Sequence, residues 1–180
     1  MKSTGEVMGI ASSFGEAFAK AQMGAGEHVP RAGRVFMSVE DRHKASIVTV
    51  ARGIQKVGLE IVATSGTAQI LAGAGIKVGK VRKVGEGRPN IIDRIVNGAI
   101  QLVINTPIGK GPRADGYSIR RAALLRKVLC VTTIPGAHAI AQGIAALCNG
   151  NMTVQALQDF FPRKVRSLTK RKRRVRVNSA

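Results

Sequence analysis

The chain has 180 residues, of which 44% are hydrophobic and 22% charged, a composition typical of one globular domain with extensions. This length excludes two large domains. The sequence has neither an apolar run of the ~18 residues that a membrane span needs nor a signal peptide, so we expect a cytoplasmic protein with no membrane partner. With 29 Lys and Arg against 10 Asp and Glu, the net charge of +19 indicates polyanions or small anionic ligands as partners.

The sequence indicates neither a metal-binding site nor a reactive cysteine. Cys130 and Cys148 lie too far apart for a metal-binding cluster, and their apolar neighbours predict buried, reduced thiols. The three histidines form no pair with metal-ligand spacing. We therefore expect neither a metal nor a cofactor in this chain.

The first 29 residues are expected to hold one short helix and a linker. A helix from Ser13 to Gln22 is indicated by a serine at the N-cap and a glycine near the end. Its apolar positions follow helical spacing and need a partner to pack against: Phe14, Ala17, Phe18 and Ala21. The glycine-rich segment 24–30 that follows has the composition of a linker.

From Arg34 onward, short apolar runs alternate with amphipathic stretches, which is typical of βαβ units around a parallel sheet. The expected strands are Arg34–Val39, Glu60–Ala63, Lys80–Val84, Gln101–Asn105 and Leu129–Thr132. The expected helices are Arg42–Val57, Thr67–Ala74, Ile91–Asn97, Ser118–Lys127, Pro135–Leu147 and a last one, Thr153–Asp159. This alternation predicts an α/β fold, a three-layer α/β/α open sheet of about five mainly parallel strands of Rossmann type, with ligands outside the carboxyl ends of the strands.

Polar residues gather where the predicted strands end. The segment 64–67, Thr-Ser-Gly-Thr, follows the second strand and leads into a helix, so hydroxyls, backbone N–H groups and the positive end of the helix dipole meet there. Lys83 supplies a point charge beside the third strand, and Asn105 and Thr106 supply oriented hydrogen bonds at the end of the fourth. Together these residues predict a phosphate site on one rim of the sheet.

The alternative is a purely structural role for the same residues. Thr64 or Ser65 can serve simply as the N-cap of the helix, for which hydroxyl side chains are preferred. Lys83 can be a solvated residue at a strand end. Taken singly, each residue favours the structural role. Because the residues share one rim of the sheet, a structural role and a phosphate-binding role are equally supported when the residues are considered together.

Four strings of this sequence resemble the methylglyoxal-synthase-like domain at the C-terminus of carbamoyl-phosphate synthase large subunits. They are Ala63–Ala68 (ATSGTA), Val84–Asp93 (VGEGRPNIID), Leu102–Pro107 (LVINTP) and Asp115–Ala123 (DGYSIRRAA), in the order and spacing of that family. The opening Met1–Gly9 resembles the closing signature of the ATP-grasp half that precedes this domain. The resemblance implies an ATP-grasp remnant plus linker at 1–29 and a methylglyoxal-synthase-like allosteric domain at 30–160. The remaining residues, 161–180, are rich in Lys and Arg, a composition that predicts a basic, disordered tail.

The resemblance also implies a regulatory domain with no catalytic residues of its own. Relatives of this kind bind nucleotide monophosphates such as UMP and IMP, and so control carbamoyl phosphate synthesis for pyrimidine and arginine biosynthesis. Carried over by position, the effector phosphate-binding residues are Lys44, Thr64, Ser65, Gly66, Thr67, Lys83, Asn105 and Thr106. Ile91 and Asp115 are the other effector contacts, and Thr132 belongs to the ornithine interface.

The parent enzyme that the resemblance implies is a glutamine-hydrolysing, ATP-dependent ligase that uses Mg or Mn. Its implied partners are the remainder of the large subunit and the glutaminase small subunit. Relatives under acetylglutamate control carry a tryptophan where Lys83 stands. Since this chain has no tryptophan, nucleotide control is favoured.

Two other functions have candidate residues in the sequence. A stand-alone lyase of the methylglyoxal synthase type would need a carboxylate base after the third strand, and Glu86 is the candidate. We expect Arg88 to pair with Glu86 and keep it ionised and structural. The run Arg163–Arg176 would bind nucleic acid electrostatically, but it lacks interleaved aromatic residues, so nucleic acid is an unfavoured partner.

Overall fold

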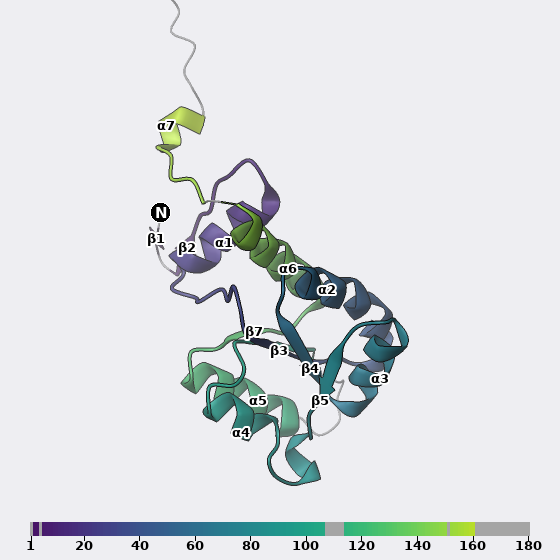
Figure 1. Ribbon diagram of the computed structural model, residues 1–180. Helices are drawn as coiled ribbons and strands as arrows, with labels where there is room; N and C mark the ends of the chain where they lie inside the picture. The colour runs from purple at the N-terminus through teal and green to yellow at the C-terminus, as the bar shows by residue number, and fades with distance from the viewer. Residues whose placement is uncertain (1, 4, 107–113, 151, 161–180) are drawn as a thin grey trace, which may run out of the picture.

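The computed structural model describes residues 2–3, 5–106, 114–150 and 152–160 and is built around one sheet (Figure 1). Five strands form it in the order β5-β4-β3-β6-β7, and every neighbouring pair is parallel. They are β3 (Arg34–Ser38), β4 (Glu60–Ala63), β5 (Val78–Lys80), β6 (Leu102–Asn105) and β7 (Leu129–Val131). A separate antiparallel pair is formed by β1 (Lys2–Ser3) and β2 (Glu6–Val7).

Helices cover both faces of this sheet, which confirms the predicted three-layer α/β/α fold (Figure 1). One face carries α2 (Lys44–Lys56), α3 (Ser65–Gly73) and α6 (Ile134–Asn149), and the other carries α4 (Ile91–Val96) and α5 (Ala114–Leu125). The remaining elements are the 3₁₀ turns η1 (Asp41–His43) and η2 (Val84–Glu86) and the short α7 (Leu157–Phe160). Within the described ranges, no helix combines the length and the apolar character that crossing a bilayer requires.

Alternate residues of each strand feed two separate cores, because successive side chains of a strand point to opposite faces of the sheet. In β3, Val35 and Met37 pack in the larger core, which α2, α3 and α6 complete, whereas Phe36 packs in the smaller core under α4 and α5. Val103 of β6 lies beside Phe36 in the smaller core. All four side chains are 0% exposed, which explains why the strands read as unbroken hydrophobic runs.

The N-terminal helix α1 (Phe14–Gly24) packs against α6 of the same chain (Figure 1). The predicted apolar face of this helix is confirmed in part. Phe18 is partly buried against the larger core, but Phe14 is 61% exposed and the buried positions are Gly15 and Ala19. The contact selects small residues, because a Cβ placed on Gly15 would lie 2.5 Å from the backbone oxygen of Gln142. The two helix backbones therefore approach more closely than bulky side chains allow.

The edge strand β5 is shifted from its predicted position. It covers Val78–Lys80 rather than Lys80–Val84, and η2 begins where the predicted strand was to end. The ladder stops because the neighbouring strand β4 ends at Ala63, whose carbonyl accepts a last bond from Val81 N at 3.0 Å. Beyond that point the backbone has no strand to pair with and turns away from the sheet.

The two cysteines are free thiols but less buried than predicted. Cys130 is half-buried on β7, and Cys148 is exposed in the last turn of α6, where its Sγ lies 3.7 Å from the carbonyl oxygen of Arg31. Burial raises the pKa of the Cys130 thiol, and the charge of Arg120 opposes this shift. The prediction of burial from apolar neighbours is therefore confirmed in part for Cys130. It is wrong for Cys148, which lies in the exposed last turn of α6.

Candidate anion-binding site

The order of the strands creates a switch point between β3 and β6. From β3 the chain proceeds through β4 to β5 on one side, and it then crosses to β6 and β7 on the other side. In open α/β sheets, ligands bind outside the carboxyl ends of the strands at such a switch. Here those ends carry Ser38 and Asn105, which lie in register. The predicted rim therefore coincides with the position that the topology favours for a ligand.

Buried polar side chains concentrate at this edge of the sheet. Within the part of the chain that the structure describes, they are Thr64, Thr67, Asn90, Asn105 and Thr106. All except Asn90 belong to the set carried over by resemblance. Because burying a polar group costs free energy unless it is hydrogen-bonded, each of these groups needs a partner or a ligand.

Two of the threonines fasten the loop that follows β3. Thr67 Oγ1 accepts a hydrogen bond from Val39 N at 3.3 Å, and Thr106 Oγ1 accepts one from Glu40 N at 3.0 Å. A hydroxyl that accepts one bond still has its own proton to donate. These side chains thus hold the rim in shape and retain a donor each.

The first turn of α3 lacks a side-chain cap. Thr64 stands at the N-cap position with extended backbone angles but makes no capping bond, and its hydroxyl donates to Ser38 Oγ at 3.3 Å instead. Ser65 is exposed and Gly66 is half-buried. The first N–H groups of a helix have no partner inside the helix, and the positive end of its dipole lies there. This turn therefore has the donors and the polarity that bind an oxyanion.

Two lysines add positive charge to the same place. Lys44 Nζ forms an ion pair with Asp41 Oδ1 at 2.7 Å, and a Cβ placed on Gly66 would lie 3.2 Å from that Nζ. The hydrogen bond from Lys44 holds the pKa of Asp41 below its ordinary value, and the charges of Lys44 and Lys83 lower it further. Both ammonium groups therefore act electrostatically near the start of α3.

The Nδ2 atom of Asn105 is buried without a partner in the part of the chain that the structure describes. The residue is 5% exposed, and its Nδ2 makes no hydrogen bond to any described residue. A Cβ placed on Gly116 would lie 3.5 Å from this Nδ2 and 3.3 Å from Arg120 Nη1, so both groups lie beside the first turns of α5. A buried donor without a partner costs about 1–3 kcal/mol. The rim thus presents a donor that an oxygen-rich ligand would satisfy.

The other predicted contacts are Ile91, Asp115 and Thr132. Ile91 is fully buried in the smaller core, so its side chain packs there, below the rim. Asp115 belongs to the first turn of α5, and its side chain lies outside the described part of the structure. Thr132 follows β7, half-buried, next to Thr133, which caps α6 by accepting a hydrogen bond from Gly136 N at 3.1 Å. The tail 161–180 also lies outside the described residues.

Asp41 and Arg120 border the rim and were missed in the sequence. The i, i+3 spacing of Asp41 and Lys44, a spacing at which helical side chains meet, is a signal that could have found the first of them. Arg120 had no such signal. Its position depends on how α5 docks on the sheet, which local sequence does not determine.

Glu86, the candidate base of a lyase, is held by the backbone. Its Oε2 accepts a hydrogen bond from Lys83 N at 2.9 Å, and the residue is exposed. The expected ion pair between Glu86 and Arg88 is wrong, because Arg88 Nε lies 3.6 Å from Asp93 Oδ1. The carboxylate of Glu86 thus closes a turn at the start of η2.

Comparison with known proteins gives this fold its class. Residues 46–132 match the family model of the MGS-like domain, and the chain therefore belongs to the proteins that carry this domain. Among the proteins that are similar to this chain over most of its length are carbamoyl phosphate synthase large chains. Those of Pseudomonas putida and Acidobacterium capsulatum are 51% and 53% identical to this chain, over 89% and 88% of its length.

This chain spans only a small part of those relatives, 15% of the Pseudomonas protein and 14% of the Acidobacterium protein. A shorter relative from Methanopyrus kandleri is described as the C-terminal section of the carbamoyl phosphate synthase large chain. It is 48% identical over 172 residues, which cover 92% of this chain and 32% of that protein. The chain is thus homologous to one portion of a longer protein.

Proposed function

We propose that this chain is the regulatory domain of a carbamoyl phosphate synthase large chain and binds a nucleotide monophosphate, UMP or IMP, at the rim. The observation that carries the proposal is the buried, unpartnered amide of Asn105 at the switch point of the sheet. This amide lies at the edge of the sheet that also carries the uncapped first turn of α3. Both the amide and the helix turn offer N–H groups that can donate hydrogen bonds to a phosphate.

In this proposal the phosphate accepts hydrogen bonds from the N–H groups of Gly66 and Thr67 and from Asn105 Nδ2. Lys44 and Lys83 balance its charge, and the hydroxyls of Thr64, Ser65 and Thr106 complete the set of donors. Asp115 and the backbone near Ile91 would lie toward the rest of the nucleotide. Recognition then rests on the phosphate, which UMP and IMP share.

The proposed regulation needs the rest of the large chain. An effector shifts an equilibrium only through different affinities for two states, and this chain is a small part of its relatives. We propose that residues 1–29 join it to an ATP-grasp region and that residues 30–160 form the effector domain, with 161–180 as a basic tail. Thr132 would border an ornithine site, and ATP, Mg or Mn and the glutaminase subunit would belong to the parent enzyme in the cytoplasm.

Calorimetric titration of the 180-residue chain with UMP and with IMP tests the proposal. We expect saturable binding that Lys83→Ala weakens about tenfold, since a hydrogen bond to a charged group is worth about 1.5–3 kcal/mol. Lys77→Ala is the matched control, because it removes the same charge from an exposed position before β5. Absence of saturable heat at millimolar nucleotide, or equal effects of the two variants, would overturn the assignment.

A further inference from the structure

A second surface lies between α4 and α5, on the face of the sheet opposite α2 and α3 (Figure 1). It is a groove of about 520 Å³, and none of the proposed phosphate-binding residues lines it. Its walls are rows at i, i+4 spacing: Ile92 and Val96 on α4, and Tyr117, Arg121 and Leu125 on α5. Residues four apart on a helix lie on one side of it, so each helix presents one continuous row to the groove.

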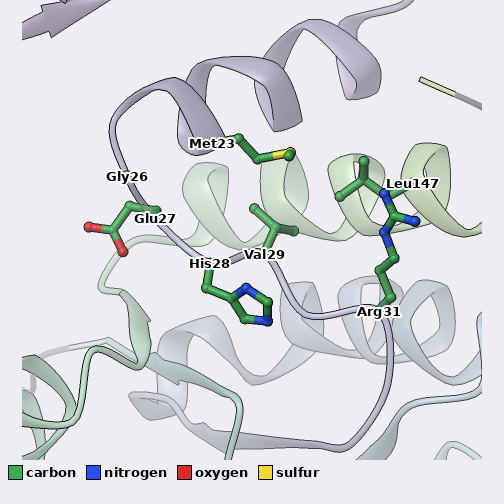
Figure 2. A pocket seen from close by; sticks show the side chains of 7 residues that line it. All are labelled: Met23, Gly26, Glu27, His28, Val29, Arg31 and Leu147. Carbon is green, nitrogen blue, oxygen red and sulfur yellow. The ribbon is translucent and has the colours of Figure 1, made fainter. Parts of the chain in front are cut away.

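Large apolar side chains stand open along this groove. Leu125 is 73% exposed, Tyr117 is 58% exposed and Val96 is 40% exposed. Leu124, beside Leu125 on α5, is 78% exposed. Contiguous apolar residues rimmed by polar ones mark interaction surfaces, and Tyr and Arg are enriched among the residues that dominate binding energy. Another pocket, around His28 and Met23 (Figure 2), lacks such a row.

Among the described side chains, the charged residues of the groove are all basic: Arg88, Arg121 and Arg126. Arg88 pairs with Asp93 at 3.6 Å, whereas no ion pair within the described residues includes Arg121 or Arg126. In the part of the chain that the structure describes, these two arginines therefore have no carboxylate partner beside the apolar walls.

We propose that this groove docks an acidic amphipathic α-helix of a partner protein, which lies along α4 and α5. Its apolar residues would contact Val96, Tyr117 and Leu125, and its carboxylates would pair with Arg121 and Arg126. The positive charge of the groove favours an acidic helix over a second copy of this chain. The chain carries +19, so a second copy would bring like charge to the groove, and nucleic acid offers no aliphatic anchor for Leu125. The proposal is independent of nucleotide binding at the rim.

A labelled 18-residue peptide serves as the probe, with leucines at i, i+3, i+4 and i+7 spacing and glutamates on the other positions. Fluorescence anisotropy against the full chain should show saturable binding at micromolar concentrations, with a gain of helical signal in circular dichroism. Leu125→Ser and Arg121→Glu should each weaken binding at least fivefold. Their matched controls, Ile70→Ser on α3 and Lys77→Glu before β5, alter exposed residues elsewhere and should leave it unchanged.

A charge swap tests the orientation of the contact. The same peptide with lysines in place of the glutamates should not bind the unchanged chain and should bind the variant with both Arg121→Glu and Arg126→Glu. Since Leu125 and Arg121 contribute little to the core, thermal unfolding should confirm that each variant folds. No saturable binding at millimolar peptide, or binding indifferent to Leu125→Ser, overturns the proposal. The proposal is also overturned if the chain forms a dimer, or binds an oligonucleotide, and Leu125→Ser abolishes that complex, because the groove then binds something other than an acidic helix.

Discussion

Lys44 Nζ lies 2.7 Å from Asp41 Oδ1, so the ammonium group beside the first turn of α3 is already paired with a carboxylate. A phosphate bound at this turn must share Lys44 with Asp41 or displace it. The pair is exposed on the side of Asp41, whose side chain is 91% exposed, which keeps the carboxylate free to move away. We therefore expect Asp41 to lower the affinity of the rim for anions and to contribute little to the stability of the fold.

Asp41→Asn should increase the affinity for UMP about two- to fivefold, because it removes a negative charge that competes with the phosphate for Lys44. The size of the effect follows from the free energy of an exposed ion pair, about 0.2–1 kcal/mol. The pKa of Asp41 is lowered, so the carboxylate is ionised at neutral pH and the pair is lost only as the pH falls through that lowered pKa. The comparison is therefore made at pH 7 by calorimetry. Glu27→Gln, an exposed carboxyl in the linker, is the control. Weaker binding by Asp41→Asn would contradict the role assigned to Lys44.

Asn105→Ala should lower the affinity for UMP about tenfold while changing the midpoint of thermal unfolding little. The Nδ2 atom that it removes has no partner among the described residues, so no described hydrogen bond from Nδ2 is lost. Asn105→Asp should abolish binding, since it places a carboxylate where the phosphate would lie. Calorimetry and thermal unfolding, run on the same samples, separate the two effects. Unaltered affinity in both variants would show that the amide does not contact the ligand.

The contact between α1 and α6 predicts opposite outcomes for two glycines. Gly15→Ala should lower the free energy of unfolding by about 1–3 kcal/mol, because its Cβ would meet Gln142 O at 2.5 Å. Gly143→Ala should be neutral or stabilising by up to about 1 kcal/mol, because its Cβ would meet ordinary contacts at 3.5 Å and alanine favours the helix. Urea denaturation measures both. Equal effects would mean that α1 does not pack on α6 in this way.

The two thiols should differ in reactivity. Burial raises the pKa of Cys130, so less of it is thiolate at pH 8, and access to it is restricted, whereas Cys148 is exposed. Iodoacetamide should therefore modify Cys148 several-fold faster, as measured by mass spectrometry of the peptides that contain each cysteine. In 8 M urea the two rates should converge. Similar rates in the folded chain would contradict the burial of Cys130.

The sequence predicts the sheet well because strand positions are marked by unbroken apolar runs. Phe36 and its neighbours are buried on both faces of the sheet, and short apolar runs of this kind are typical of strands in a covered parallel sheet. The shift of β5 was not predictable in this way, since its end is set by where β4 stops at Ala63, a tertiary constraint. The buried face of α1 was misplaced in part for a related reason. Gly15 has no side chain, so an apolar pattern cannot register it.

The rim was predictable to the extent that its residues follow buried strands. Thr64 and Asn105 come directly after or at the end of such strands, which places them at one edge whatever the loops do. Arg120 depends on the docking of α5, and Asp41 on the turn η1, so neither has a local signature. Ile91 was assigned by resemblance, and its side chain is fully buried in the smaller core, which leaves its backbone for any contact at the rim.

Nucleotide binding at the rim is tested most directly by titrating the ¹⁵N-labelled chain with UMP and recording nuclear magnetic resonance spectra. We expect the amide signals of Gly66 and Thr67 and the side-chain NH₂ signals of Asn105 to move together, saturably and with one dissociation constant. Inorganic phosphate should move the same signals at higher concentration. Saturable shifts elsewhere in the chain, with these signals stationary, would contradict the central claim that the rim is the nucleotide site.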